Sequence, residues 1–165
     1  MITENDIIFK YKEFDKDEEL DAADRELLNA AKETAINAYA PYSQFKVGAA
    51  VRLESGKIVL GTNVENAAFP SGICAERSAL SSASSNFPGD KPVALAIAAL
   101  NERGLTTDPV SPCGNCRQVI VEEEYRNSNN IRIILKGKNK IRMIEKGGDL
   151  LPLQFNMKNL KVNPH

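Results

Sequence analysis

Residues 92–100, with the sequence PVALAIAAL, decide the fold: this nearly continuous apolar run carries no charge, which is typical of a strand buried on both faces. Residues 131–135, IRIIL, predict a second strand. The segment between them, from Pro112 to about Tyr125, predicts a helix that is entered through a proline. Strand, helix and strand in this order indicate an α/β layer with crossover connections.

Three predicted elements come earlier in the chain. Apolar residues recur at three- and four-residue intervals over 21–39 and predict an amphipathic helix that covers a sheet. Residues 45–53 and 57–63 are strand-like and are joined at Ser55-Gly56, so they predict an antiparallel hairpin. A second helix is expected from near Cys74 to the turn that begins at Phe87.

The remaining segments are shorter or polar. Residues 65–72 and 101–111 are expected to be loops, 136–146 to add a hairpin strand, and 149–151 to form a short last helix. Residues 1–18 alternate weakly and predict either a short strand or an ordered arm. A length of 165 residues with 42% hydrophobic composition predicts a single domain spanning 1–165.

The charge composition indicates the class of ligand. The net charge is -1 and no long block of like charges occurs, so a nucleic-acid or anionic membrane partner is not expected, and a small neutral ligand fits better. The chain has no apolar run of about 20 residues and no signal-peptide pattern near its start, which predicts a cytoplasmic protein.

The cysteines point to a metal site. The chain has three, an odd number for a disulfide framework. The pair in Cys113-Gly114-Asn115-Cys116 fits a structural zinc half-site, a redox pair or buried thiols when it is considered alone. A redox pair needs no third cysteine, yet Cys74-Ala75-Glu76 supplies one together with a carboxylate. The only histidine, His165, is the last residue and a poor candidate for a preformed site.

Three thiolates leave one coordination position of a zinc ion for water, which is the arrangement of catalytic zinc. We therefore predict that Cys74, Cys113 and Cys116 bind zinc, with one ion per subunit. Glu76, two residues beyond the first ligand, can face the zinc-bound water as a general acid and base. Considered alone, Glu76 could also be a helix-start carboxylate that the helix dipole favours.

Two arginines stand beside the predicted ligands. Three thiolates and one divalent cation sum to a negative charge, which weakens zinc as a Lewis acid. We hypothesise that Arg77 or Arg117 donates hydrogen bonds to a ligand sulfur and offsets this charge. The alternative is that both arginines are solvated surface residues.

Four pieces of the sequence resemble, in order, the small all-cysteine form of the cytidine deaminase family. They are PYSQFKVGA at 41–49, NVENA at 63–67, CAER at 74–77 and PCGNCRQ at 112–118. The resemblance spans roughly Leu27 to Phe155. It implies a three-layer α/β/α fold with a mixed five-stranded sheet and helices on both faces. An arm over residues 1–23 lies outside the clearest similarity and is longer than expected for the family.

The resemblance also implies an activity, the zinc-dependent hydrolytic deamination of cytidine and 2'-deoxycytidine in pyrimidine salvage, with Glu76 moving the protons. It implies that Asn63 and Glu65 bind the ribose hydroxyls and that Phe45 packs on the base. The backbone around Ala67, Ala75 and Cys113 is expected to contact the polar edge of the base. Without the resemblance, Asn63 could form a turn and Phe45 could be ordinary core.

Members of this all-cysteine form resemble one another in assembling as homotetramers whose sites borrow residues from neighbouring subunits. The matching positions here are Tyr42, Phe69 and Phe155, although Phe69 stands where a tyrosine is common.

The sequence leaves three alternative functions to compare with this activity. Deamination of a cytosine-containing antibiotic such as blasticidin is disfavoured because residues 63–67 match the nucleoside form. Polynucleotide editing needs a basic channel and stacking residues, whereas the net charge is -1 and the chain has no tryptophan. A non-catalytic, zinc-stabilised interaction domain is disfavoured by the presence of Glu76.

Overall fold

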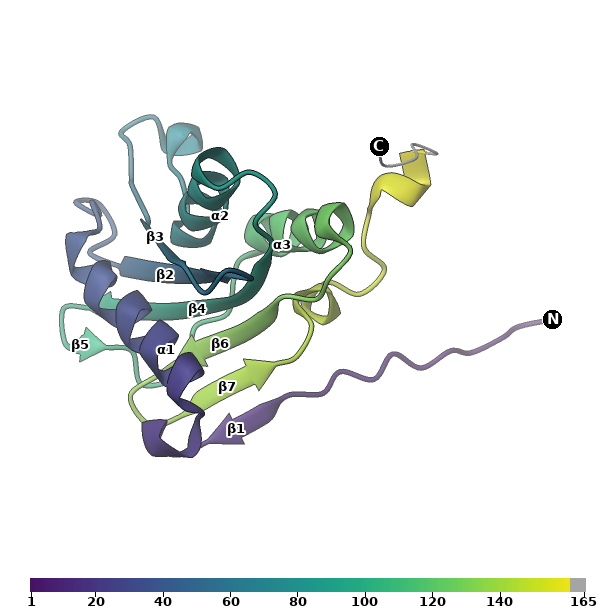
Figure 1. The fold of residues 1–165 in the computed structure, drawn as a ribbon, viewed down its shortest axis with the longest axis horizontal. Helices are drawn as coiled ribbons and strands as arrows, with labels where there is room; N and C mark the ends of the chain where they lie inside the picture. The colour runs from purple at the N-terminus through teal and green to yellow at the C-terminus, as the bar shows by residue number, and fades with distance from the viewer. Residues whose placement is uncertain (161–165) are drawn as a thin grey trace.

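A mixed β-sheet runs through the middle of the molecule in the computed structural model, which describes residues 1–160 (Figure 1). The sheet has seven strands in the order β1-β7-β6-β4-β2-β3, with β5 paired to β4. Strands β4 and β6 are parallel, and the other paired strands are antiparallel. The strands are β1 (Lys12–Phe14), β2 (Lys46–Leu53), β3 (Ile58–Thr62), β4 (Pro92–Asn101), β5 (Gly104–Leu105), β6 (Arg132–Lys136) and β7 (Ile141–Ile144).

The mixed α/β architecture is confirmed, but the predicted number of five strands was too small. The five predicted strands are β2, β3, β4, β6 and β7. The two further strands are β1, which lies in the N-terminal arm and pairs with β7, and β5, which lies in the expected loop 101–111. They have only three and two residues, which is too short for a periodic hydrophobic pattern to develop.

Three α-helices cover the two faces of the sheet (Figure 1). Helix α1 (Ala22–Thr34) lies on one face, and α2 (Ala75–Asn86) and α3 (Gly114–Asn127) lie on the other. The described residues also form short 3-10 helices: η1 (Asp17–Glu19), η2 (Ala35–Asn37), η3 (Phe69–Ser71), η4 (Gly147–Leu150) and η5 (Met157–Leu160). Within residues 1–160, no helix is long and apolar enough to cross a membrane.

The buried central strand β4 separates two hydrophobic clusters, as its apolar sequence predicts. Leu95 and Ile97 pack toward α2 and α3, whereas Ala94, Ala96 and Ala98 pack toward α1. This alternation follows the two-residue period of a strand. The small alanine side chains face α1, so this helix can approach the sheet closely.

Gly48 in β2 is a further point of close approach, because a Cβ atom at this position would lie 2.0 Å from the Ala31 carbonyl oxygen of α1. We expect Gly48→Ala to lower the free energy of unfolding by about 1–3 kcal/mol, since α1 must move away from the sheet. Urea unfolding of both proteins measures the change. An unchanged midpoint would show that α1 is not seated against β2 as described.

Candidate functional site

The three cysteines meet where two helices begin. Cys74 is the N-cap of α2, Cys113 is the N-cap of α3, and Cys116 lies in the first turn of α3. Their sulfur atoms all lie within 4.8 Å of one another, with 3.9 Å between Cys74 and Cys113 and 3.6 Å between Cys113 and Cys116. The structure thus brings Cys74 next to the Cys113 and Cys116 pair, although Cys74 and Cys113 are 39 residues apart in the sequence. The distances suit three sulfurs that share one ion.

The protonation of the thiols depends on their surroundings. Burial raises the pKa values of Cys74 and Cys116, and the nearby Glu76 carboxylate raises both further. Burial also acts to raise the pKa of Cys113, but hydrogen bonds from the Cys116 backbone N–H and thiol, the Asn115 backbone N–H and the Cys74 thiol together outweigh it, so this pKa is lowered. Backbone donors at the start of α3 therefore favour one thiolate, and a bound cation is needed to favour all three.

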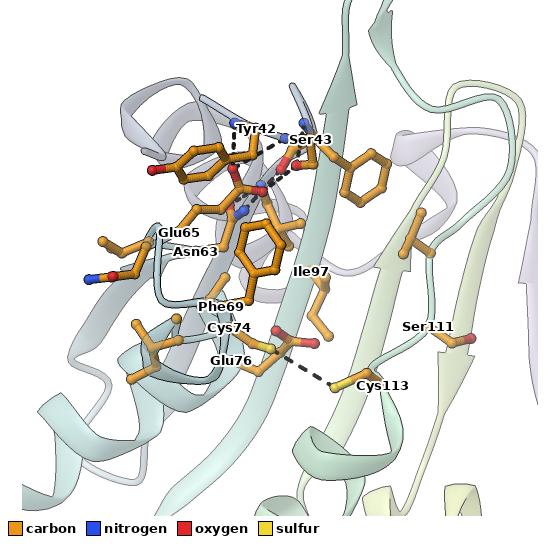
Figure 2. Close-up of a pocket in the computed structure, with 18 residues that line it drawn as sticks. Tyr42, Ser43, Asn63, Glu65, Phe69, Cys74, Glu76, Ile97, Ser111 and Cys113 are labelled. Atoms are coloured by element: carbon orange, nitrogen blue, oxygen red, sulfur yellow. Dashed lines mark hydrogen bonds between the residues drawn. The ribbon is translucent and has the colours of Figure 1, made fainter. Parts of the chain in front are cut away.

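Glu76 lies beside the sulfurs on the first turn of α2 and is 5% exposed. Burial raises the pKa of its carboxyl group. Figure 2 shows the carboxylate between Cys74 and Ile97, near Cys113. A carboxylate in this position can exchange protons with a molecule bound next to the sulfurs.

These residues line one end of an open pocket of about 820 Å³ (Figure 2). The lining comes from the start of β2, the segments that follow β3, the start of α2 and the approach to α3. Its members include nine of the predicted site residues: Tyr42, Phe45, Asn63, Glu65, Phe69, Cys74, Ala75, Glu76 and Cys113. Cys116, in contrast, is fully buried.

Two polar side chains occupy the opposite end of the pocket. Glu65 accepts hydrogen bonds from the backbone N–H groups of Tyr42 at 2.9 Å and Ser43 at 3.2 Å, and from the Ser43 hydroxyl. These bonds, the hydroxyl first among them, lower the pKa of Glu65. Asn63 accepts from the Val47 N–H at 2.7 Å and donates to the Phe45 carbonyl at 2.9 Å. Both side chains are therefore held in fixed orientations.

Some predicted residues lie elsewhere. Ala67 is not among the residues that line the pocket. Phe155 is 58% exposed, and its carbonyl oxygen accepts a hydrogen bond from the Gln118 side chain at 2.9 Å. His165 lies outside the described residues.

The two arginines are placed differently from each other. Arg77 is half-buried on α2. Arg117 donates from Nε to the Pro112 carbonyl oxygen and from Nη1 to the Leu150 carbonyl oxygen, both at 2.9 Å. Among the hydrogen bonds of residues 1–160, none joins either arginine to a sulfur, so the hypothesis that one of them tunes the thiolates stays a prediction.

Ser43, Val110 and Ser111 also line the pocket, although no role was predicted for them from the sequence. Ser43 lies within a recognised motif, and its hydroxyl two residues before Phe45 could have suggested a hydrogen-bonding role. Val110 and Ser111 come from a polar loop without a pattern. They reach the pocket because they lie just before Cys113, which the fold places next to Cys74.

Three cysteine sulfurs next to a buried carboxylate in an open pocket are typical of a metal-dependent enzyme. A family model described as the cytidine and deoxycytidylate deaminase zinc-binding region matches residues 21–129. The chain belongs to this family. Its cofactor is zinc, and the soft sulfur donors on α2 and α3 fit that ion.

Known cytidine deaminases are similar to this chain in sequence and in structure over more than half of its length. The cytidine deaminase of Halalkalibacterium halodurans is 44% identical over 96 residues, which cover 58% of this chain and 68% of the relative. The cytidine deaminase of Mycobacterium tuberculosis H37Rv is 34% identical over 130 residues, 79% of this chain and 87% of the relative. The crystal structure of the Burkholderia pseudomallei cytidine deaminase superposes with a TM-score of 0.68 at 40% identity, covering 79% and 97% of the two chains.

Proposed function

We propose that this enzyme hydrolyses the free nucleosides cytidine and 2'-deoxycytidine to uridine and 2'-deoxyuridine, with release of ammonia. The observation that carries the proposal is the pocket itself. The three sulfurs and the Glu76 carboxylate lie at one end, and the hydrogen-bonding side chains Asn63 and Glu65 lie at the other. The volume of about 820 Å³ has room for a nucleoside between the two ends.

Cys74, Cys113 and Cys116 would hold the zinc ion. When bound, zinc acts as a Lewis acid that makes hydroxide available from water near neutral pH. The start of α3 contributes backbone N–H groups of Asn115 and Cys116 that favour the Cys113 thiolate. Cys116 is fully buried, so its sulfur is shielded from solvent.

Glu76 carries the protons in this proposal. One carboxylate oxygen takes a proton from the attacking water and delivers it to ring nitrogen N3. The oxygen of the water bonds to carbon C4 as N3 is protonated. Glu76 then takes the proton of the new C4 hydroxyl and passes it to the amino group, the C4–N4 bond breaks, and ammonia leaves as the C4 carbonyl forms. Burial of Glu76 excludes bulk water as a competing proton donor.

The other end of the pocket would bind and orient the nucleoside. Asn63 and Glu65 are assigned to the ribose hydroxyls, and Phe45 to the face of the base. The backbone at Ala75 and Ala67 is assigned to the polar edge of the base. Support comes from the lining positions of Asn63, Glu65, Phe45 and Ala75. Because hydrogen bonds already fix Asn63 and Glu65, these side chains lose less conformational entropy when the substrate binds.

We expect Glu65→Gln to lower kcat/KM for cytidine about tenfold, mainly through KM. A carboxylate forms stronger hydrogen bonds to hydroxyl groups than an amide does, and the difference is about 1.4 kcal/mol. Steady-state kinetics measure the change. The exposed Glu54→Gln is the matched control. With 2',3'-dideoxycytidine, which lacks both hydroxyls, wild type and variant should have similar KM values. A tenfold difference that persists with this substrate would argue against the sugar contact.

The direct test incubates the purified protein with cytidine, 2'-deoxycytidine, blasticidin S and a cytosine-containing single-stranded oligonucleotide. Uridine and ammonia formed in equal amounts from the nucleosides support the proposal. Turnover of only the antibiotic or only the oligonucleotide would replace it. If zinc is bound but no substrate is deaminated, the chain is a zinc-stabilised interaction domain instead.

A homotetrameric, cytoplasmic enzyme of pyrimidine salvage remains our proposal for assembly and location. The exposed aromatic rings of Tyr42 and Phe69, with centroids 5.8 Å apart at the pocket rim, support a contact with a neighbouring subunit, as does exposed Phe155. Sedimentation equilibrium tests the assembly, and a monomer at assay concentration would contradict it.

A further inference from the structure

Glu124 is a buried carboxylate that the proposed chemistry does not use. It lies near the end of α3 and is 7% exposed. Its Oε1 atom accepts hydrogen bonds from the backbone N–H groups of Ile131 at 2.7 Å and Gly147 at 2.8 Å. Its Oε2 atom accepts from the N–H of Gly148 at 2.9 Å. One side chain therefore holds the start of η4 and the segment that enters β6.

The surroundings are built around this carboxylate. A Cβ atom on Gly147 would lie 2.4 Å from the Ile120 side chain, and one on Gly148 would lie 2.8 Å from Oε2 of Glu124. Only glycines let the backbone approach α3 so closely. Burial raises the pKa of Glu124, while the three N–H donors and the nearby Lys146 favour its charged form. Burying this carboxylate costs free energy, and the fold accepts that cost in exchange for three hydrogen bonds to the backbone. This indicates that the position of η4 matters.

A second link joins η4 to the metal site. The Arg117 guanidinium donates from Nη1 to the Leu150 carbonyl oxygen at the end of η4. It also donates from Nε to the carbonyl oxygen of Pro112, the residue before Cys113. Positions 117 and 124 are about two helical turns apart, so both side chains project from the same side of α3. Helix α3 thus holds η4 at both of its ends, and η4 orients Arg117.

We propose that Glu124 is a positioning residue for the zinc site. It fixes η4, η4 fixes the guanidinium of Arg117, and Arg117 fixes the Pro112 carbonyl and with it the turn that carries Cys113. The inference rests on the proposed ligand role of Cys113 and Cys116. It predicts that a substitution of Glu124 alters the metal site even though the three cysteines and Glu76 are not themselves substituted.

The test is the rate at which zinc passes from the folded protein to a chromogenic chelator. Glu124→Gln has the same shape, but its amide NH2 group must face a backbone N–H group. We expect zinc release about 3- to 10-fold faster than in wild type, less than the 10- to 100-fold typical of direct partners of metal ligands. The cobalt-substituted protein should show a changed thiolate-to-cobalt absorption. Glu122→Gln, exposed on the same helix, is the matched control and should behave as wild type.

A double-mutant cycle with Arg117→Lys separates this role from a general loss of stability. If both residues act through η4, the double variant should release zinc no faster than the faster single variant. Additive effects, or an unchanged release rate and cobalt spectrum in Glu124→Gln, would overturn the proposal. Ile134→Val, which lies in the cluster under α1, should lower the melting temperature without changing the cobalt spectrum.

A replacement variant and an assay that is independent of turnover complete the test. If Glu124→Gln does not fold, Gly148→Ala pushes on the same carboxylate and replaces it in the cycle. Zinc release does not require turnover. A wild-type protein that binds zinc but deaminates nothing therefore refutes the proposed function and leaves this inference open to its own test.

Discussion

Glu76→Gln is expected to reduce kcat for cytidine by about 10³- to 10⁴-fold, the upper part of the range for a single acid–base group. In the proposed mechanism this carboxylate transfers a proton at two stages, and an amide can do neither. The substitution keeps the size of a side chain that is 5% exposed, so the pocket should keep its shape. The measurement is uridine formation at saturating cytidine, with zinc determined in the same samples.

Zinc should remain bound to this variant. The Glu76 carboxylate raises the pKa values of Cys74 and Cys116, so its removal makes the thiolates easier to form. Glu33→Gln, on the exposed side of α1, serves as the control and should retain full activity. Activity within tenfold of wild type in the zinc-loaded Glu76 variant would remove Glu76 from the mechanism.

Cys116→Ser should remove both zinc and activity. A serine hydroxyl stays protonated near neutral pH, so one of three anionic ligands is lost from a fully buried position. We expect less than about 0.1 zinc per chain after dialysis, compared with about one in wild type, and no detectable deamination. Metal analysis and the uridine assay give both quantities.

The same variant should also lose its thermal response to zinc. Zinc that binds the folded state at 1,000 times its dissociation constant adds about 4 kcal/mol to the free energy of unfolding. Wild-type protein stripped with a chelator should therefore melt at a lower temperature and recover when zinc is added. Cys116→Ser should show no recovery. Ile120→Val, buried on the same helix, controls for packing and should keep its zinc. A fully metallated Cys116→Ser protein would exclude Cys116 as a ligand.

The local elements followed from the sequence where a segment was long enough to show a pattern. The run at 92–100 predicted β4, and the three- and four-residue spacing over 21–39 predicted α1. The helix over 21–39 is shorter than predicted, because the chain changes to the 3-10 helix η2 at Ala35. Strand β1 had only the weak alternation over residues 1–18, which was equally compatible with an ordered arm, and β5 had no signal of its own. They form because β7 and β4 offer unpaired backbone groups beside them.

The sequence also predicted which residues form the candidate metal site. Three cysteines, their spacing and the neighbouring Glu76 were enough to predict a metal site, because thiolates and a carboxylate have few other combined uses. The positions of Val110, Ser111 and Glu124 had no comparable signal. Each depends on loops that only the packed sheet and helices bring together.

The sequence by itself determined the donor atoms, the α/β pattern of the elements and the residues available for proton transfer, since these depend on residue type and local spacing. Only the tertiary structure decided that sulfurs from α2 and α3 lie within 4.8 Å of one another, and that η4 is fixed to α3 by Glu124 and Arg117. These contacts join segments that are distant in the chain. Their geometry is set by how the helices pack on the sheet, which local sequence patterns do not specify.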